Sequence, residues 1–193
     1  MQENKVVEID KKREVKTYAE MWHTSQCLLA KGIKDHEGCF HQFRASLVFT
    51  AFTLEACLNH LGPKVFSCWA DLERLSPKQK LNIICEKLDL KTDYGERPWQ
   101  VMKELFGFRN DIAHGKSEIV TTQEVVPLAD HGGKDINDIV RTKWEQYCTR
   151  ANAERAREDV EQIVKDIYAA GDFKDDHPFM FGFQFSAATV IDR

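Results

Sequence analysis

The stretch "SLVFTAFTLEACLNHLG" (residues 46–62) decides the fold class of this chain. Its apolar residues recur every three or four positions, which is the spacing of one face of an α-helix. The members of this apolar stripe are Leu47, Ala51, Leu54, Leu58 and Leu61. The pattern predicts a helix over about residues 40–61, ended by Gly62-Pro63. A stripe this continuous has to pack against other helices, so it indicates a helical bundle.

Further helix signals lie on both sides of this stretch. An amphipathic pattern predicts a first helix over residues 12–33. Ser76, Pro77 and Gln79 match the N-cap, first-turn and capping-box positions of a helix that runs to about Leu88. The remaining predicted helices are residues 65–74, 98–114 and 135–170, the last with Asp135 as its cap. We therefore expect a mainly all-α protein, with a bundle of four to five helices.

Two segments late in the chain have strand patterns instead. Residues 118–126 are rich in β-branched side chains. The tail "HPFMFGFQFSA" (residues 177–187) carries phenylalanine at every second position from Phe179 to Phe185, which is the period of a β-strand. We expect this tail either to pair with residues 118–126 or to pack across a dimer interface. The prediction is one domain over residues 1–193, with a helical core at about 12–170 and a small β-hairpin or C-terminal strand within 171–193.

The composition excludes several functions. The net charge is −4, from 27 basic and 31 acidic residues, which argues against a broad basic surface that binds duplex DNA. A local cationic pocket for a phosphate remains compatible with this charge. There is no apolar run of the ~20 residues that a membrane span needs, and the first residues have no apolar signal segment. We expect a cytoplasmic protein with no membrane partner.

Motifs for cofactors and metals are missing from the sequence. The six cysteines form no C-x-x-C pair, so we expect reduced thiols packed in the core. Cys57 with His60, and His36 with Cys39 and His41, are loose groupings without the four converging ligands of a zinc site. Glycine-rich nucleotide loops and the G-x-S-x-G elbow are also absent from the sequence. The expectation is therefore no metal and no cofactor.

A second stretch, "ELFGFRNDIAHGK" (residues 104–116), carries the candidate site. Arg109 falls in the apolar face of its predicted helix. An arginine there is costly unless it meets an acid, a polar cavity or the surface of a partner. His114 ends the helix just before Gly115, a residue suited to a left-handed cap. Asn110 and Asp111 lie between the two and can orient either of them.

Arg109 and His114 together suit the chemistry of a phosphodiester. The cation can stabilise negative charge on the phosphorus oxygens, and the imidazole can move the proton. The structural alternative is that Arg109 forms a salt bridge and His114 merely caps the helix. Glu55, within the apolar stripe, either pairs with Arg109 across the bundle or lies in water at the edge of the stripe.

The segment "FRNDIAHG" (residues 108–115), preceded by the helix quoted first, resembles the HEPN superfamily (higher eukaryotes and prokaryotes nucleotide-binding). The family signature is an arginine followed four to six residues later by a histidine, with a polar residue directly after the arginine. Arg109, Asn110 and His114 fill these positions. The helix that carries Glu55 and Asn59 is similar to an earlier helix of the family. The resemblance covers about residues 40–116.

The resemblance implies a homodimer in which two Arg-x4-His motifs face one cleft. It implies a metal-independent RNA endonuclease, of a kind that is often a toxin or an antiviral effector and has an antitoxin or another regulatory partner. His114 would activate the ribose 2′-hydroxyl or protonate the leaving oxygen, Arg109 would hold the scissile phosphate, and Asn110 would position one of them. The products would be a 2′,3′-cyclic phosphate and a 5′-hydroxyl. The alternative is a catalytically inactive member that binds nucleotides or RNA, or only dimerises.

Overall fold

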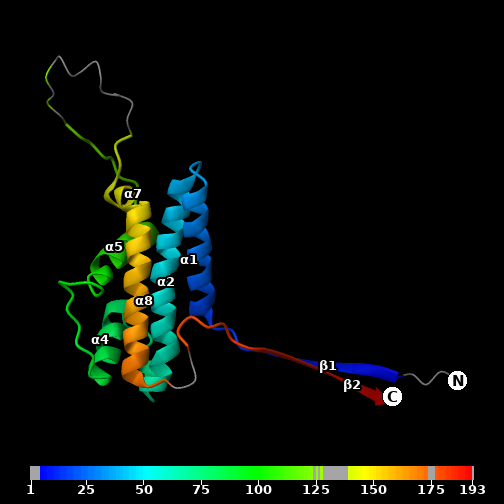
Figure 1. The fold of residues 1–193 in the computed structure, drawn as a ribbon. Helices are drawn as coiled ribbons and strands as arrows, with labels where there is room; N and C mark the ends of the chain where they lie inside the picture. The colour runs from blue at the N-terminus through cyan, green and yellow to red at the C-terminus, as the bar shows by residue number, and fades with distance from the viewer. Residues whose placement is uncertain (1–4, 124, 126, 128–138, 174–176, 193) are drawn as a thin grey trace. The chain divides into compact units, whose positions relative to one another are not determined.

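The structure is a computed structural model, and it describes residues 5–123, 125, 127, 139–173 and 177–192. This part of the chain is mainly helical, with a small two-stranded antiparallel sheet (Figure 1). Its elements are β1 (Lys5–Arg13), α1 (Thr17–Lys34), α2 (Cys39–Val65), α3 (Trp69–Leu72), α4 (Pro77–Lys87), α5 (Val101–His114), α7 (Lys143–Tyr147), α8 (Arg150–Gly171) and β2 (Gln184–Asp192). The predicted mainly helical class with a small β element is confirmed.

Contacts divide the chain into two compact units, and each unit takes part of α1, α2 and α8. The first unit comprises Met1–Thr24, Phe52–Thr92 and Glu161–Arg193, and we call it the sheet unit because it holds β1 and β2. The second comprises Ser25–Ala51 and Asp93–Val160, and we call it the motif unit because it holds α5. The expectation of one helical domain over the whole chain stays a prediction.

The core of the sheet unit forms around the second half of the apolar stripe of α2. Leu54, Leu58 and Leu61 are completely buried, as the periodicity predicts. The fully buried partners from the other helices of this unit are Leu81 and Ile84 of α4 and Ile163, Val164 and Ile167 of α8. Within the same unit, the hydroxyl groups of Tyr18 and Tyr168 share a buried hydrogen bond of 2.8 Å. The core thus satisfies its buried polar atoms at this point.

Helix α2 does not end at Gly62-Pro63, and this prediction is wrong. The helix continues to Val65, and the amide of Phe66 still donates to the carbonyl of Gly62 at 2.8 Å. Gly62 packs against the indole of Trp69, where an added Cβ would lie 2.2 Å from the ring. The glycine therefore serves close packing inside a helix and not a cap.

The predicted start of α4 is confirmed, whereas other helix starts differ. Ser76 and Gln79 form a capping box, and Pro77 is the first helical residue. The 65–74 helix is only the four residues of α3. Helix α5 begins at Val101 and not at Pro98, because the amides of Val101 and Met102 donate three residues back, at 3.3 and 3.1 Å. Bonds that span three residues and not four form a tighter turn, which lies before the α-helix begins.

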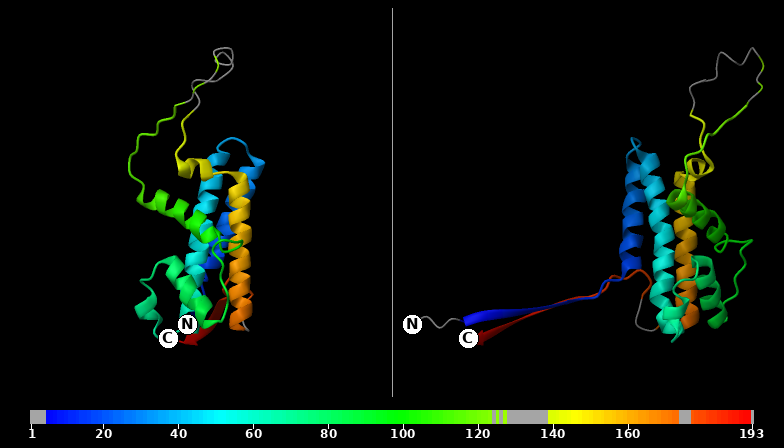
Figure 2. Two further views of the ribbon diagram at one scale, coloured as in Figure 1. Left: turned by 90° about the vertical axis from the view of Figure 1, so that its left-hand side faces the viewer. Right: turned by 180° about the vertical axis from the view of Figure 1, so that it is seen from behind.

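The N-terminal helix begins at Thr17 and not at residue 12, because the preceding residues form a strand. Strand β1 pairs antiparallel with β2, in a register that runs from Lys5 opposite Asp192 to Arg13 opposite Gln184. The right-hand view in Figure 2 shows the two strands side by side, β1 in blue and β2 in red. The predicted pairing of the tail with residues 118–126 is therefore wrong, since the described residues of that segment lie outside any strand.

Only one of the four tail phenylalanines lies in the strand. Phe185 belongs to β2, whereas Phe179 adopts a left-handed φ of 67° in a turn and stacks on Trp22, with ring centroids 4.3 Å apart. Phe181 meets His23 edge-on at 5.7 Å. The alternation of phenylalanines thus overstates the length of the strand.

The last predicted helix is two helices in the described part of the chain, and its predicted cap, Asp135, lies outside that part. Helix α7 begins with a capping box between Thr142 and Glu145, and α8 begins at Arg150 after a short break. The amide of Asn152 donates to the hydroxyl of Thr149 at 3.2 Å, which starts α8. The side chains of Thr142 and Thr149 thus each accept a hydrogen bond from the first turn of the helix that follows. The two helices therefore begin separately.

Candidate functional site

Helix α5 presents the motif from a firmly packed base. Its buried residues are Val101, Met102, Leu105, Phe106 and Phe108. The ring of Phe108 packs against Tyr147 of α7, with centroids 5.3 Å apart. Burial raises the pKa of Tyr147 to about 12, so its hydroxyl stays protonated. Glu104 accepts a 2.6 Å bond from Arg155 of α8. These contacts fix α5 while its C-terminal turn stays accessible.

Arg109 is half-buried, and its Nε atom is enclosed by protein. Its Nη1 atom donates a 3.0 Å hydrogen bond to Oδ1 of Asn110. This bond turns the guanidinium toward the exposed side of the helix and fixes the orientation of the Asn110 amide. Arg109 therefore contacts Asn110 directly, and the role of either residue in a reaction stays a prediction.

Gly115 does not adopt the left-handed cap that the sequence predicts. Its φ of −55° and ψ of 137° are extended, so the chain leaves the helix straight. The glycine is explained by a close approach, since an added Cβ would lie 2.6 Å from the carbonyl oxygen of Asp111. A side chain at this position would therefore clash with the last helical turn.

A large open cleft of about 1050 Å³ lies at this end of α5, within the motif unit. Asn110, Asp111 and His114 line it together, and all three are exposed. Asn110 and Asp111 lie four and three positions before His114, so both are on the same side of the helix as the histidine. Arg109 is five positions from His114, about 140° around the helix axis, and does not line the cleft. The structure thus brings three of the motif residues together and places Arg109 behind Asn110.

The other walls of the cleft carry a local excess of positive charge. Lys116 follows the motif directly, and Arg141 and Lys143 come from the segment around the start of α7. The acidic side chains at the cleft are Asp111 and Glu118, so three basic and two acidic side chains line it. A cleft with this balance attracts phosphate although the whole chain is acidic. Sequence reasoning missed these three basic residues.

An apolar pocket of about 360 Å³ shares Arg141 with this cleft. Its other lining residues are Cys39, Phe40, Phe43, Ile139, Glu145, Cys148 and Thr149. The guanidinium of Arg44 lies 5.7 Å from the ring of Phe40 and 6.0 Å from the ring of Trp144. Burial raises the pKa of Cys148 to about 11, so the thiol that this residue contributes to the wall of the pocket is neutral. The pocket is an aromatic recess beside a cationic cleft.

Glu145 links the two cavities through the cap of α7. Its carboxylate accepts bonds from the amide and the hydroxyl of Thr142, at 2.7 and 2.8 Å. These bonds lower the pKa of Glu145, which is therefore ionised at neutral pH. Thr142 lines the cleft and Glu145 lines the pocket, so the capping box fixes the boundary between them.

The remaining candidate residues lie elsewhere on the chain. Glu55 is half-buried on α2 and belongs to the sheet unit, and its pairing with Arg109 stays a prediction. Asn59, on the same helix, accepts a 2.8 Å bond from the buried ammonium group of Lys80. Among the described residues, no three His, Cys, Asp or Glu side chains are grouped to hold a metal ion. No described helix is long and apolar enough to cross a membrane.

Neither a family model, nor a curated protein, nor a solved structure matches this chain. The resemblance to the HEPN superfamily therefore rests on the residues quoted above.

Proposed function

We propose that this protein is a metal-independent endoribonuclease of the HEPN type. The observation that carries the proposal is the cleft at the end of α5, where the exposed His114 shares one wall with Asn110 and Asp111 and faces the basic residues Lys116 and Arg141. A histidine beside fixed cations is the minimal set for cleaving RNA without a metal ion, because proton transfer and charge stabilisation are then both supplied.

The proposed reaction uses the ribose of the substrate as its nucleophile. The 2′-hydroxyl loses its proton and attacks the adjacent phosphorus, the bond to the 5′-oxygen breaks, and that oxygen takes up a proton. The products are a 2′,3′-cyclic phosphate and a 5′-hydroxyl. His114 carries one of the two proton transfers, while Lys116, Arg141 and Lys143 hold the phosphate oxygens.

Arg109 has a positioning role within its own chain in this proposal. Its bond to Asn110 holds the amide at the wall of the cleft. We further propose that a homodimer brings two such motifs to one RNA strand, so that the active assembly contains two His114 side chains. The resemblance supports this arrangement, and it also supports a role as a toxin or antiviral effector restrained by an antitoxin or another regulatory partner.

The apolar pocket suits a base of the bound RNA. Bases of single-stranded RNA stack on aromatic side chains, and Phe40 offers such a ring beside Arg141, which the pocket shares with the cleft. Replacing Phe40 with Ala should weaken RNA binding by about tenfold, because one stacked base contributes on the order of 1–3 kcal/mol. Fluorescence anisotropy with a short single-stranded RNA measures this effect.

A matched control for this experiment is Phe66→Ala, which removes a half-buried phenylalanine from the sheet unit, where Phe66 stacks near Trp69. This variant should bind RNA like the wild type. Equal binding by the Phe40 variant and the wild type would contradict a base in the apolar pocket.

A second candidate function has its own observation. The half-buried Arg109 and its bond to the next residue are what a structural arginine would also show. In that case the protein binds nucleotides or RNA, or only dimerises, and cleaves nothing. The two candidates differ in the fate of the substrate and in the properties of the variants.

The test is cleavage of single-stranded RNA and tRNA in excess EDTA. We expect the wild type to cleave, and His114→Ala to be slower by a factor of about 10² or more with unchanged thermal stability, because general acid–base catalysis contributes that much. Lys103→Ala, an exposed change on the same helix away from the cleft, should retain full activity. No cleavage by the wild type, together with an Arg109→Ala variant that melts early, would favour the binding module.

A further inference from the structure

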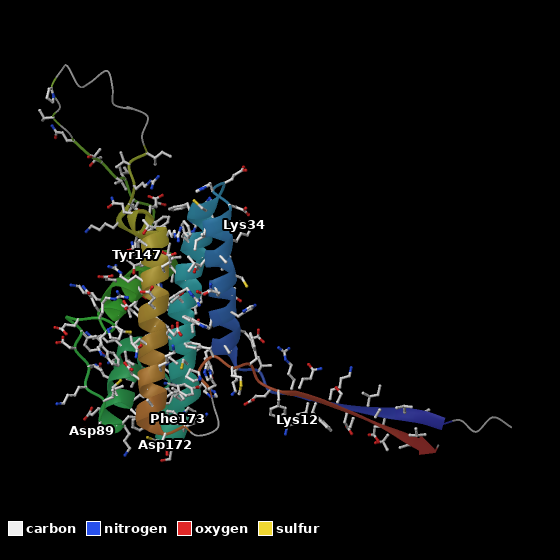
Figure 3. All side chains as sticks on the ribbon, viewed as in Figure 1. Lys12, Lys34, Asp89, Tyr147, Asp172 and Phe173 are labelled. Carbon is white, nitrogen blue, oxygen red and sulfur yellow. The ribbon has the colours of Figure 1, made fainter. Side chains whose placement is uncertain are left out.

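The ribbon formed by β1 and β2 exposes apolar side chains that the described part of the chain leaves uncovered. Val7, Ile9, Phe185 and Val190 are 55%, 61%, 58% and 60% exposed. Lys12, labelled in Figure 3, lies in β1 directly opposite Phe185. A two-stranded ribbon is only marginally stable in water unless further strands or another surface cover it. The two strands, with nine paired residues each, therefore form a surface that a binding partner would stabilise.

The two free edges of the ribbon differ in charge. From Val6 to Arg13, β1 carries two acidic and three basic residues, whereas β2 has no charged residue from Gln184 to Ile191. Charged side chains are the usual protection of an edge strand against pairing with another chain. The edge of β1 is therefore protected, and the edge of β2 is open.

We propose that the free edge of β2 pairs antiparallel with β2 of a second copy of this chain, giving a four-stranded sheet across a two-fold axis at Ala188. Ala188 is the middle residue of β2, so this register pairs all nine residues of the strand with their counterparts. It places Phe185 opposite Ile191 of the second copy, on the same face of the sheet. Both faces of the ribbon thereby gain apolar contacts.

The centre of this sheet would be a row of small and branched side chains. Ile9 lies opposite Ala188 within one ribbon. The row across the axis is then Ile9, Ala188, Ala188 of the second copy and Ile9 of the second copy. Two small residues at the axis allow close approach of the strands, and the flanking isoleucines cover them. Such a row closes on itself, as a symmetric dimer requires.

The other ways of pairing two ribbons are less favourable. The corresponding two-fold pairing of β1 with itself, centred on Ile9, would place Glu8 opposite Asp10 of the second copy, and this like-charge contact would occur twice. Pairing β1 with β2 of another copy would continue without closing and would build filaments. The charges of β1 therefore leave the β2 edge as the surface that forms a closed pair.

The test is the molar mass of the full chain by sedimentation equilibrium, with charges introduced at the axis. The wild type should be a dimer. Ala188→Asp and Ala188→Lys should each raise the dimer Kd by about tenfold or more, since each places like charges opposite one another. Mixing the two variants in equal amounts should restore the dimer, because Asp then faces Lys. Glu8→Lys, a charge change on β1, should leave the dimer unchanged.

The mixing step separates loss of the interface from loss of the ribbon. A variant whose ribbon has unfolded cannot be rescued by an oppositely charged partner, so a mixture that stays monomeric overturns the proposal. A monomeric wild type would overturn it as well. Dimers that persist in both single variants would also overturn the β2 pairing, and they would leave the homodimer of the proposed function to a different surface. The measurement reads mass alone, so it does not depend on whether the protein cleaves RNA.

Discussion

Asp159 and Arg97 form an ion pair with one buried and one exposed partner in the motif unit. Nε of Arg97 donates to Oδ1 of Asp159 at 2.7 Å, and the side chains are 50% and 6% exposed respectively. Burial raises the pKa of Asp159 despite the opposing effect of Arg97, whose own pKa is raised by the hydrogen bond to this carboxylate. Burial therefore outweighs pairing at the carboxyl group, and the ionised form costs stability above its folded pKa.

Arg97→Ala should lower the free energy of unfolding by about 1–3 kcal/mol at neutral pH, because it leaves a buried carboxylate without its charged donor. The pKa of Asp159 in the folded variant should rise further. Since a raised folded pKa means that protonation favours the folded state, the loss should shrink as the pH falls through that pKa. Urea denaturation at about pH 7 and about pH 4 measures both values.

The control for this prediction is Arg150→Ala, which breaks an exposed pair with Glu154 four residues along the same helix. Its cost should be no more than about 0.5 kcal/mol. If Arg97→Ala were equally destabilising at both pH values, the burial of an ionised Asp159 would not be the cause.

The sequence places the motif residues on one helix but predicts only part of the cleft beside them. His114, Asn110 and Asp111 could be placed on one helix end, because helical spacing is a local property. Arg141 and Lys143 lie far along the sequence from Asn110 and line the same cleft only in the folded chain, and no local pattern encodes this proximity. The conformation of Gly115 also depends on the direction of the residues that follow it. A local pattern does not encode this direction, so the predicted left-handed cap is wrong.

Alanine substitutions at one glycine of α2 and one of α5 test whether the close packing at Gly62 stabilises the fold. Gly62→Ala should destabilise the fold by about 1–3 kcal/mol, because the added methyl group would meet the indole of Trp69 at 2.2 Å. Gly107→Ala should stabilise it by about 0.5–1 kcal/mol, since nothing lies within 4 Å of the new Cβ and alanine favours the helix. Urea denaturation of both variants gives the two values, and effects of the same sign would contradict the packing at Gly62.

Strongly periodic elements could be predicted from the sequence, whereas the sheet could not. The apolar stripe of α2 and the capping box of α4 are local signals, and both are found. The predicted first helix overlaps the last two residues of β1, because "KVVEIDKKR" mixes apolar and charged residues without clear alternation. Its partner β2 lies at the other end of the sequence, so the pairing is a non-local property.

At the scale of the whole molecule, net charge and local charge point in different directions. A chain with a net charge of −4 would repel RNA on average, yet the cleft concentrates Lys116, Arg141 and Lys143 near His114. We expect binding that is confined to this cleft and weakened by salt. The mainly helical class could be predicted from periodicity alone, but the strand edges that we propose for dimerisation exist only in the folded chain.

In the reaction that we propose, the cleft at the end of α5 uses the ribose 2′-hydroxyl of RNA as the nucleophile. The most direct measurement compares, in excess EDTA, the wild-type cleavage of an RNA oligonucleotide with that of the same oligonucleotide carrying one 2′-deoxynucleotide at the cleaved position. We expect a 2′,3′-cyclic phosphate end from the RNA, no cleavage at the 2′-deoxy position, and cleavage of the RNA that is slower by a factor of about 10² or more in His114→Ala. Cleavage at the 2′-deoxy position, or cleavage by His114→Ala at the wild-type rate, would contradict this chemistry.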